Sequence, residues 1–193
     1  ALILLRTHGD VNLTGLITTS AVLTAVIGLA AQSTLSSLFS GITLQMERPF
    51  NIGDWISYKE YIGQVQGITW KTTRLITRED ETIYIPNTEV STATFKNFSR
   101  PSTRHVAKIE VGIEYDAPPN EVRRAILNVL HAHPEVLKEP ASEVRLKTFG
   151  DFAIAYEAIF WHRDYADEPR VKAEINNQLW YALHRAGIKI PFP

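Results

Sequence analysis

Cysteine is absent from this sequence, which excludes disulfide bonds and thiolate metal ligands. Charge is also missing from a long stretch, because no Asp, Glu, Lys or Arg occurs in the 36 residues from Val11 to Met46. Arg6 is the only one of the 20 Lys and Arg residues that precedes Glu47, so the mean hydropathy of -0.10 averages two unlike regions. The net charge of -1 provides no general attraction to nucleic acid, which we do not expect as a partner.

The uncharged stretch predicts a helix that crosses a membrane. A continuous helix of this length would measure about 54 Å, compared with about 30 Å for the hydrocarbon core of a bilayer. Residues 13–31 are apolar on all sides, whereas residues 32–46 carry apolar side chains on one stripe and serines off it. We therefore expect a spanning helix that continues as an amphipathic helix at one face of the membrane. The alternative is the buried central helix of a soluble protein.

The pattern changes after Met46. Arg48-Pro49-Phe50 is expected to end the helix, because proline cannot continue it and biases the preceding residue toward extended geometry. Short runs rich in β-branched and aromatic residues then predict a small all-β domain of about five strands. The predicted strands are residues 55–58, 63–70, 72–77, 82–85 and 94–98.

Strand and helix patterns alternate in the last part of the chain. The predicted order is strand 106–115, helix 118–133, strands 144–149 and 154–161, helix 169–186 and strand 188–192. This β-α-β-β-α-β order is typical of a ferredoxin-like α+β domain. We expect four segments: the end of a preceding transmembrane helix and a loop (1–12), the long apolar helix (13–47), the β domain (48–103) and the α+β domain (104–193).

The sequence has no pattern typical of catalysis. It lacks a glycine-rich phosphate loop, a nucleophile elbow and an arrangement of paired carboxylates, so we expect neither enzyme activity nor a cofactor. His131 and His133 suggest a metal pair, but positions i and i+2 of a helix point apart, and no metal site is predicted. Three more histidines are scattered without evident partners: His105, His162 and His184.

Two stripes of the apolar helix suit a ring of identical helices around a lumen. Small residues let membrane helices pack closely, and one stripe carries Ala21, Ala25, Gly28 and Gln32. Apolar side chains that face a narrow pore block ions by dewetting, and the adjacent stripe carries Val22, Val26, Leu29 and Ser33. The alternative is that these side chains face lipid.

Several motifs resemble the MscS-like family of small-conductance mechanosensitive channels, and they occur in the family's order over essentially the whole chain. Residues 28–41 look like the family's pore helix. The other motifs are Arg48-Pro49-Phe50, Gly53-Asp54, Ile85-Pro86-Asn87, Asn97-Phe98-Ser99-Arg100, Ala186-Gly187-Ile188 and Ile190-Pro191-Phe192-Pro193.

The resemblance implies a homo-oligomer, expected to be a heptamer, whose pore helices ring a channel that membrane tension opens. An Sm-like β domain and the α+β domain would form a cytoplasmic vestibule with side windows. The predicted helix 169–186, with Arg170, Lys172 and Glu174, is the place to look for charges that line such windows. The expected partners are membrane lipids, permeating ions and small osmolytes. The expected location is the bacterial inner membrane, which the protein would cross more than once.

The resemblance also assigns roles within the helix. The family's two seal positions fall at Ala25 and Leu29; Leu29 has the expected bulk and Ala25 does not, so Val22 or Val26 is an alternative for the upper constriction.

A bend is expected at Gln32-Ser33, where many relatives have glycine instead of serine, and Gly41 is the better candidate for a movable hinge. Close helix packing is the alternative role for Gly41. Arg48 and Lys59 are candidates to meet lipid headgroups.

Two other functions remain open at this level. Residues 44–55 look especially like MscS-like members that carry a cyclic-nucleotide-binding domain, which suggests a channel gated or modulated by a ligand. The second is a membrane-anchored binding module or enzyme.

Overall fold

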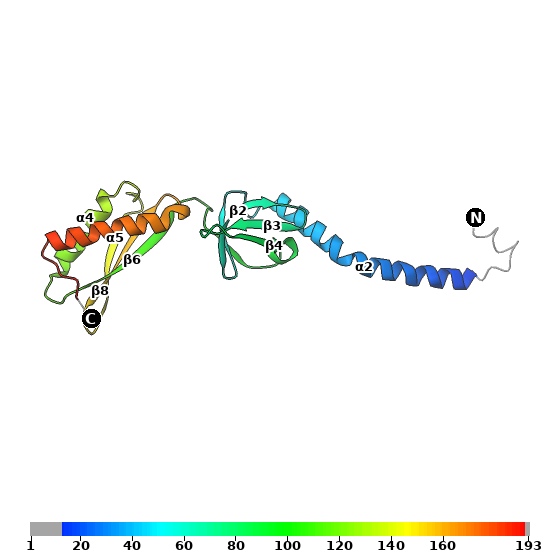
Figure 1. Ribbon diagram of the computed structural model, residues 1–193, viewed down its shortest axis with the longest axis horizontal. Helices are drawn as coiled ribbons and strands as arrows, with labels where there is room; N and C mark the ends of the chain where they lie inside the picture. Colours follow the sequence, from blue (N-terminus) through cyan, green and yellow to red (C-terminus); the bar gives the residue numbers. More distant parts are fainter. Residues whose placement is uncertain (1–12, 192–193) are drawn as a thin grey trace. The chain divides into compact units, whose positions relative to one another are not determined.

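The structure is a computed structural model that describes residues 13–191 (Figure 1). The predicted end of a preceding membrane helix, residues 1–12, lies outside the described residues, as do Phe192 and Pro193. The chain divides into two compact units. The first consists of the residues up to Gly53 together with Tyr58–Phe95, and the second consists of Asp54–Ser57 and Lys96–Pro193. Each unit is described by itself.

The first unit begins with the long helix α2, Leu13–Glu47 (Figure 1, blue to cyan). Its backbone is helical through Gln32 and Ser33. The helix ends directly before Arg48, which adopts a left-handed φ of 46° and donates its backbone N–H to the Leu44 carbonyl at 3.0 Å. Pro49 follows and has no backbone N–H with which to continue the helical hydrogen bonds.

Five short strands follow: β1 Trp55–Tyr58, β2 Tyr61–Ile68, β3 Thr72–Ile76, β4 Thr82–Pro86 and β5 Phe95–Asn97. Their order in the sheet is β4-β3-β2-β1-β5. A short helix that the sequence pattern did not predict, α3 Asn87–Val90, follows β4. The buried apolar side chains of the first unit are Leu44, Phe50, Tyr58, Val65, Leu75, Ile85 and Val90.

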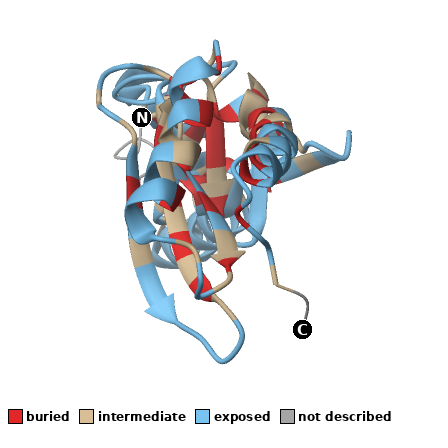
Figure 2. Ribbon diagram, turned by 90° about the vertical axis from the view of Figure 1, so that its left-hand side faces the viewer, coloured by how far each residue is buried: buried red, intermediate tan, exposed pale blue. Residues whose placement is uncertain are grey.

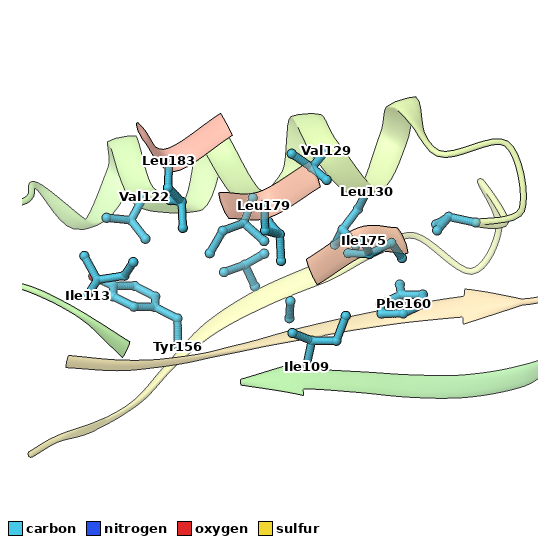
Figure 3. Close-up of a cluster of buried hydrophobic side chains, with 14 of the residues drawn as sticks. Ile109, Ile113, Val122, Val129, Leu130, Tyr156, Phe160, Ile175, Leu179 and Leu183 are labelled. Atoms are coloured by element: carbon cyan, nitrogen blue, oxygen red, sulfur yellow. The ribbon is translucent and has the colours of Figure 1, made fainter. Parts of the chain in front are cut away.

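The second unit contains β6 His105–Ile113, α4 Pro119–Ala132, β7 Glu143–Phe149, β8 Ile154–His162, the 3₁₀ helix η1 Tyr165–Asp167 and α5 Glu168–Arg185. The strands form an antiparallel sheet in the order β6-β8-β7. Side chains of β8 alternate between buried and partly exposed along its whole length, as expected for a sheet with one covered face (Figure 2). Helices α4 and α5 cover that face, and their apolar side chains point toward Tyr156, Phe160 and Ile109 of the sheet (Figure 3).

The predicted last strand, residues 188–192, is wrong for the residues described. Ile188 to Pro191 is not assigned as a strand. One backbone hydrogen bond joins it to Glu114, the residue directly after β6, from the Glu114 N–H to the Lys189 carbonyl at 3.1 Å. Pro191 has no N–H to add to a ladder. The segment is therefore attached next to the end of β6, which is an edge strand of the sheet. The expected fold class, an apolar helix followed by a β domain and an α+β domain, is confirmed.

Candidate functional site

The candidate site is α2. Every residue from Thr14 to Ala30 is exposed in this chain, including the predicted constriction and packing residues. Leu29 is 72% exposed and therefore the most exposed of the three bulky residues on the predicted lumen stripe. From Thr14 to Glu47 the helix is long and apolar enough to cross a membrane, and it is the one such helix in residues 13–191. A soluble core helix would be buried by its own chain, and this one is not.

Four of the polar side chains within the apolar stretch form hydrogen bonds with the helix itself. Hydroxyl groups donate hydrogen bonds to carbonyl groups one turn earlier, at 2.8–2.9 Å, in four pairs: Thr18 to Thr14, Thr19 to Gly15, Thr24 to Ser20 and Ser37 to Ser33. A polar group without a partner is costly in hydrocarbon. These four hydroxyl groups therefore do not prevent α2 from lying in lipid.

The last turns of α2 pack against the β domain at Gly41, which is buried. A Cβ atom at Gly41 would collide with the backbone carbonyl oxygen of Trp70 and would lie 3.0 Å from the side-chain nitrogen of Asn87. Any side chain here requires a backbone shift. The structure thus gives Gly41 a close-packing role, and its role as a hinge stays a prediction.

Asn87 holds the hairpin that receives Gly41. Its side chain is fully buried, donates to the Thr69 carbonyl at 2.9 Å and accepts a hydrogen bond from the Thr73 hydroxyl at 2.9 Å. Its backbone N–H donates to the Lys71 carbonyl, also at 2.9 Å. These three bonds fix the turn between β2 and β3 on either side of Trp70. Sequence reasoning noticed the Ile85-Pro86-Asn87 motif but missed this role, because the role depends on residues that lie far from Asn87 in the sequence.

Two family models match the chain. Residues 33–100 match the model described as "Mechanosensitive ion channel, beta-domain", and residues 107–190 match "Mechanosensitive ion channel MscS, C-terminal". The chain belongs to the MscS-like family of mechanosensitive channels. This is a family of channels and not of enzymes. The resemblance to members with a cyclic-nucleotide-binding domain stays a prediction.

Similar proteins include the large-conductance mechanosensitive channel MscMJLR of Methanocaldococcus jannaschii, 27% identical over 175 residues, which cover 86% of this chain and 48% of that protein. The low conductance mechanosensitive channel YnaI of Escherichia coli is 30% identical over 76% of this chain and 44% of its own length. The chain spans about half the length of most of the curated relatives it matches.

Solved structures share the fold. The closed state of Helicobacter pylori MscS superposes with a TM-score of 0.83 at 23% identity, covering 95% of this chain and 72% of that one. Arabidopsis thaliana MSL1 superposes with a TM-score of 0.74 at 20% identity, covering 95% and 68%.

The Gly53-Asp54 motif and the Asn97 to Arg100 motif meet through contacts of Asp54 and Trp55 within the second unit. One oxygen of the Asp54 carboxylate accepts hydrogen bonds from Asn97 Nδ2 at 3.0 Å and from Arg100 Nε at 3.1 Å. The Trp55 N–H donates to the Ser99 hydroxyl at 2.9 Å. The Gly53-Asp54 and Asn97 to Arg100 motifs are therefore two halves of one structural connection.

The two candidates to meet lipid headgroups are both at helix or strand ends. Arg48 Nε donates to the Gln45 carbonyl at 3.4 Å. Lys59 has a left-handed φ of 52°, and its Nζ lies 3.0 Å from Glu89 Oε2, which also accepts a hydrogen bond from the Tyr58 hydroxyl at 2.7 Å. The hydrogen bond with Glu89 raises the pKa of Lys59. Lys59 is therefore charged but already paired, and a lipid phosphate would have to compete with Glu89.

The charged side chains at the start of α5 form ion pairs that the sequence did not predict. Arg170 forms ion pairs of 2.7–3.1 Å with Glu135, Asp167 and Glu174, and Lys172 lies 2.5 Å from Glu168. These contacts raise the pKa of Arg170, mainly through the hydrogen bonds with Glu135. Arg170 is thus shared by three carboxylates, and Lys172 pairs with a fourth.

Two of the three histidines that look scattered in the sequence, His105 and His162, are neighbours in the structure. His133 is buried and its Nε2 lies 3.1 Å from Glu174 Oε2, whereas His131 is exposed. His105 and His162 lie directly opposite each other across β6 and β8. Among residues 13–191 no group of three or more His, Cys, Asp or Glu side chains is arranged to hold a metal ion.

Proposed function

We propose that this chain is part of the pore-forming subunit of a tension-gated ion channel, in which α2 helices from several copies line the pore. The observation that carries the proposal is the long apolar helix that its own chain leaves uncovered. Apolar surface of this extent requires lipid or other protein around it. The names of the relatives, which are mechanosensitive channels, support the same function.

The proposed pore has Leu29 as its main constriction. Leu29 is bulky and exposed, so a ring of these side chains could exclude water and ions from a narrow pore. Val22 and Val26, on the same stripe, would supply a second constriction in place of the small Ala25. Nothing lies within 4 Å of a Cβ built on Gly28, which leaves room for a neighbouring helix on the stripe formed by Ala21 and Gly28.

The finer features of the proposal follow the family resemblance. The subunits would form a homoheptamer in the bacterial inner membrane, with the β and α+β domains on the cytoplasmic side and several membrane crossings per subunit. Ions and small osmolytes would pass through the vestibule and the pore. Membrane tension would favour the open state because that state has the larger area in the membrane plane.

Purified full-length protein in liposomes tests this proposal. Patches should show no current at rest and step-like currents under suction, and detergent-extracted particles should have a central cavity with rotational symmetry. A monomeric or dimeric particle that carries no tension-dependent current would contradict the proposal and favour the membrane-anchored module.

A further inference from the structure

Five aromatic rings of the second unit form a cluster, which we call the aromatic cluster: Trp55, Phe98, His105, His162 and Tyr165. Tyr165 lies at its centre and stacks on Phe98, with ring centroids 4.2 Å apart and an interplanar angle of 6°. Trp55 lies 5.8 Å from Tyr165. The His105 ring makes T-shaped contacts with the rings of Phe98, Tyr165 and His162. The ring centroids are 5.7, 5.1 and 6.0 Å apart, respectively. Segments 54–57 and 96–104 are thus held against β6, β8 and η1 by ring packing.

His162 is an unusual member of this cluster. Its side chain is 0% exposed, and neither ring nitrogen has a hydrogen-bond partner within residues 13–191. Buried polar side chains in proteins are nearly always hydrogen-bonded, so an orphan imidazole needs an explanation. A neutral ring tolerates these apolar surroundings at moderate cost, whereas a charged ring does not.

The charged groups around His162 do not offset this burial. His105 on β6 faces it across the sheet, and α5 contributes Glu168, whose Oε2 lies 3.9 Å from His105 Nε2, and Lys172, which pairs with Glu168. Tyr165 of η1 and the backbone of Asp164 also lie close to it. Val136 forms an antiparallel bridge with His162, and the Phe160 ring centroid lies 6.3 Å from that of His162. Burial lowers the pKa of His162; His105 and Lys172 lower it further, while Glu168 and the Asp164 backbone oppose the shift.

We propose that His162 makes the aromatic cluster an acid-sensitive lock. At neutral pH the neutral ring packs inside the cluster and holds Trp55 and Phe98 against Tyr165. On acidification a proton on His162 would place an unpaired positive charge among apolar rings and beside His105. The cluster would open to let water reach the imidazole, and segments 54–57 and 96–104 would loosen.

The direction of the pH effect follows from linkage. Because the native pKa of His162 lies below its ordinary value of 6.5, the unfolded chain binds more protons than the native chain between the two values. Stability is therefore full above about pH 6.5 and falls as the pH decreases toward the native pKa. A phenylalanine at this position fills a similar volume and binds no proton.

The test compares thermal unfolding of the full-length protein in detergent at about pH 8 and about pH 5 for three forms: wild type, His162→Phe and the control His131→Gln, which removes an exposed histidine. Wild type and His131→Gln should lose about 3 °C or more of melting temperature on acidification. His162→Phe should lose less than half as much. An equal loss in all three forms would overturn the proposal.

A second measurement removes the dependence on one variant. Hydrogen exchange of the wild type, corrected for the intrinsic effect of pH, should accelerate on acidification in segments 54–57, 96–104 and 162–167 more than in α4. His162→Leu, the alternative if the phenylalanine variant does not fold, should abolish this local acceleration. Acceleration that is uniform over the second unit, or that persists in His162→Leu, would contradict the lock. Either result leaves the proposed channel function untouched, because the substitutions at residue 162 change no residue of α2.

Discussion

Gly41 of α2 and Asn87 of α3 meet where no side chain fits between them: a Cβ on Gly41 would lie 3.0 Å from the Asn87 side-chain nitrogen and would collide with the Trp70 carbonyl. Both residues belong to motifs that the sequence displays, 40-odd positions apart. Through this contact, residues of both motifs pack the end of α2 against the β domain.

Gly41→Ala should therefore disturb docking. The added methyl group meets backbone atoms of the β2–β3 turn, which cannot rotate away, so the end of α2 must shift. We expect altered closing or inactivation in patch recordings, with assembly preserved.

A hinge role would act differently, because alanine stiffens a helix by about 1 kcal/mol relative to glycine without any need for a partner. Asn87→Ala separates the two explanations. If docking matters, Asn87→Ala changes the same kinetic phase as Gly41→Ala. Normal kinetics in Asn87→Ala together with altered kinetics in Gly41→Ala would assign Gly41 to the hinge.

Asn87→Ala should also destabilise the β domain. It leaves the Thr69 carbonyl and the Thr73 hydroxyl without their present partner, and Thr73 is fully buried. An unsatisfied buried polar group costs about 1–3 kcal/mol. Denaturant unfolding of the β domain, followed by tryptophan fluorescence, should show this loss of unfolding free energy. The control Asn128→Ala, at an exposed position of α4, should leave the unfolding free energy unchanged. Equal stability of the two variants would show that the asparagine network is dispensable.

Most of the secondary structure could be predicted from the sequence, because strands such as Ile154–His162 and helices such as α5 show clear periodicity of two or 3.6 residues. The sequence pattern did not predict α3, which has only four residues. It also did not predict that residues after Ile188 form no strand, because this depends on a single backbone hydrogen bond and on Pro191.

The contacts of the candidate site could be predicted much less well. Motif residues such as Asn87 and Asp54 stood out, but their partners are set by tertiary packing. His105 and His162 looked unrelated because 56 intervening residues separate them, and only the register of β6 and β8 brings them together. Within residues 13–191 the side chains of α2 from Thr14 to Ala30 are all exposed, so no tertiary contact in the described part of the chain distinguishes one stripe of this helix from another.

Leu29→Ser should give a leaky channel that opens at lower tension. A hydroxyl in place of the isobutyl group lets water enter the constriction, which removes the dewetting barrier to ions. Leu16→Ser is the matched control, because Leu16 lies on the same apolar helix and is exposed but falls outside the lumen stripe. Single-channel recordings under stepped suction measure the opening threshold of each variant. Identical thresholds for Leu29→Ser and wild type would remove Leu29 from the gate.

Arg170→Gln should shift ion preference toward cations if α5 lines a window of the vestibule. Arg170 is shared by Glu135, Asp167 and Glu174, so its removal leaves three carboxylates without their common cation. Since the pKa of Arg170 is raised, the wild-type side chain is charged throughout the accessible pH range, and the effect of the variant should not depend on that residue's titration.

The reversal potential under a salt gradient measures this preference. Arg185→Gln is the control, because it removes the same charge from the same helix at a residue outside the carboxylate network. The shift for Arg170→Gln should be the larger of the two and should shrink as salt rises, since the screening length falls from about 10 Å at 0.1 M to about 3 Å at 1 M. Equal shifts for both variants would indicate a general surface-charge effect and would exclude a special role for the Arg170 network in guiding ions.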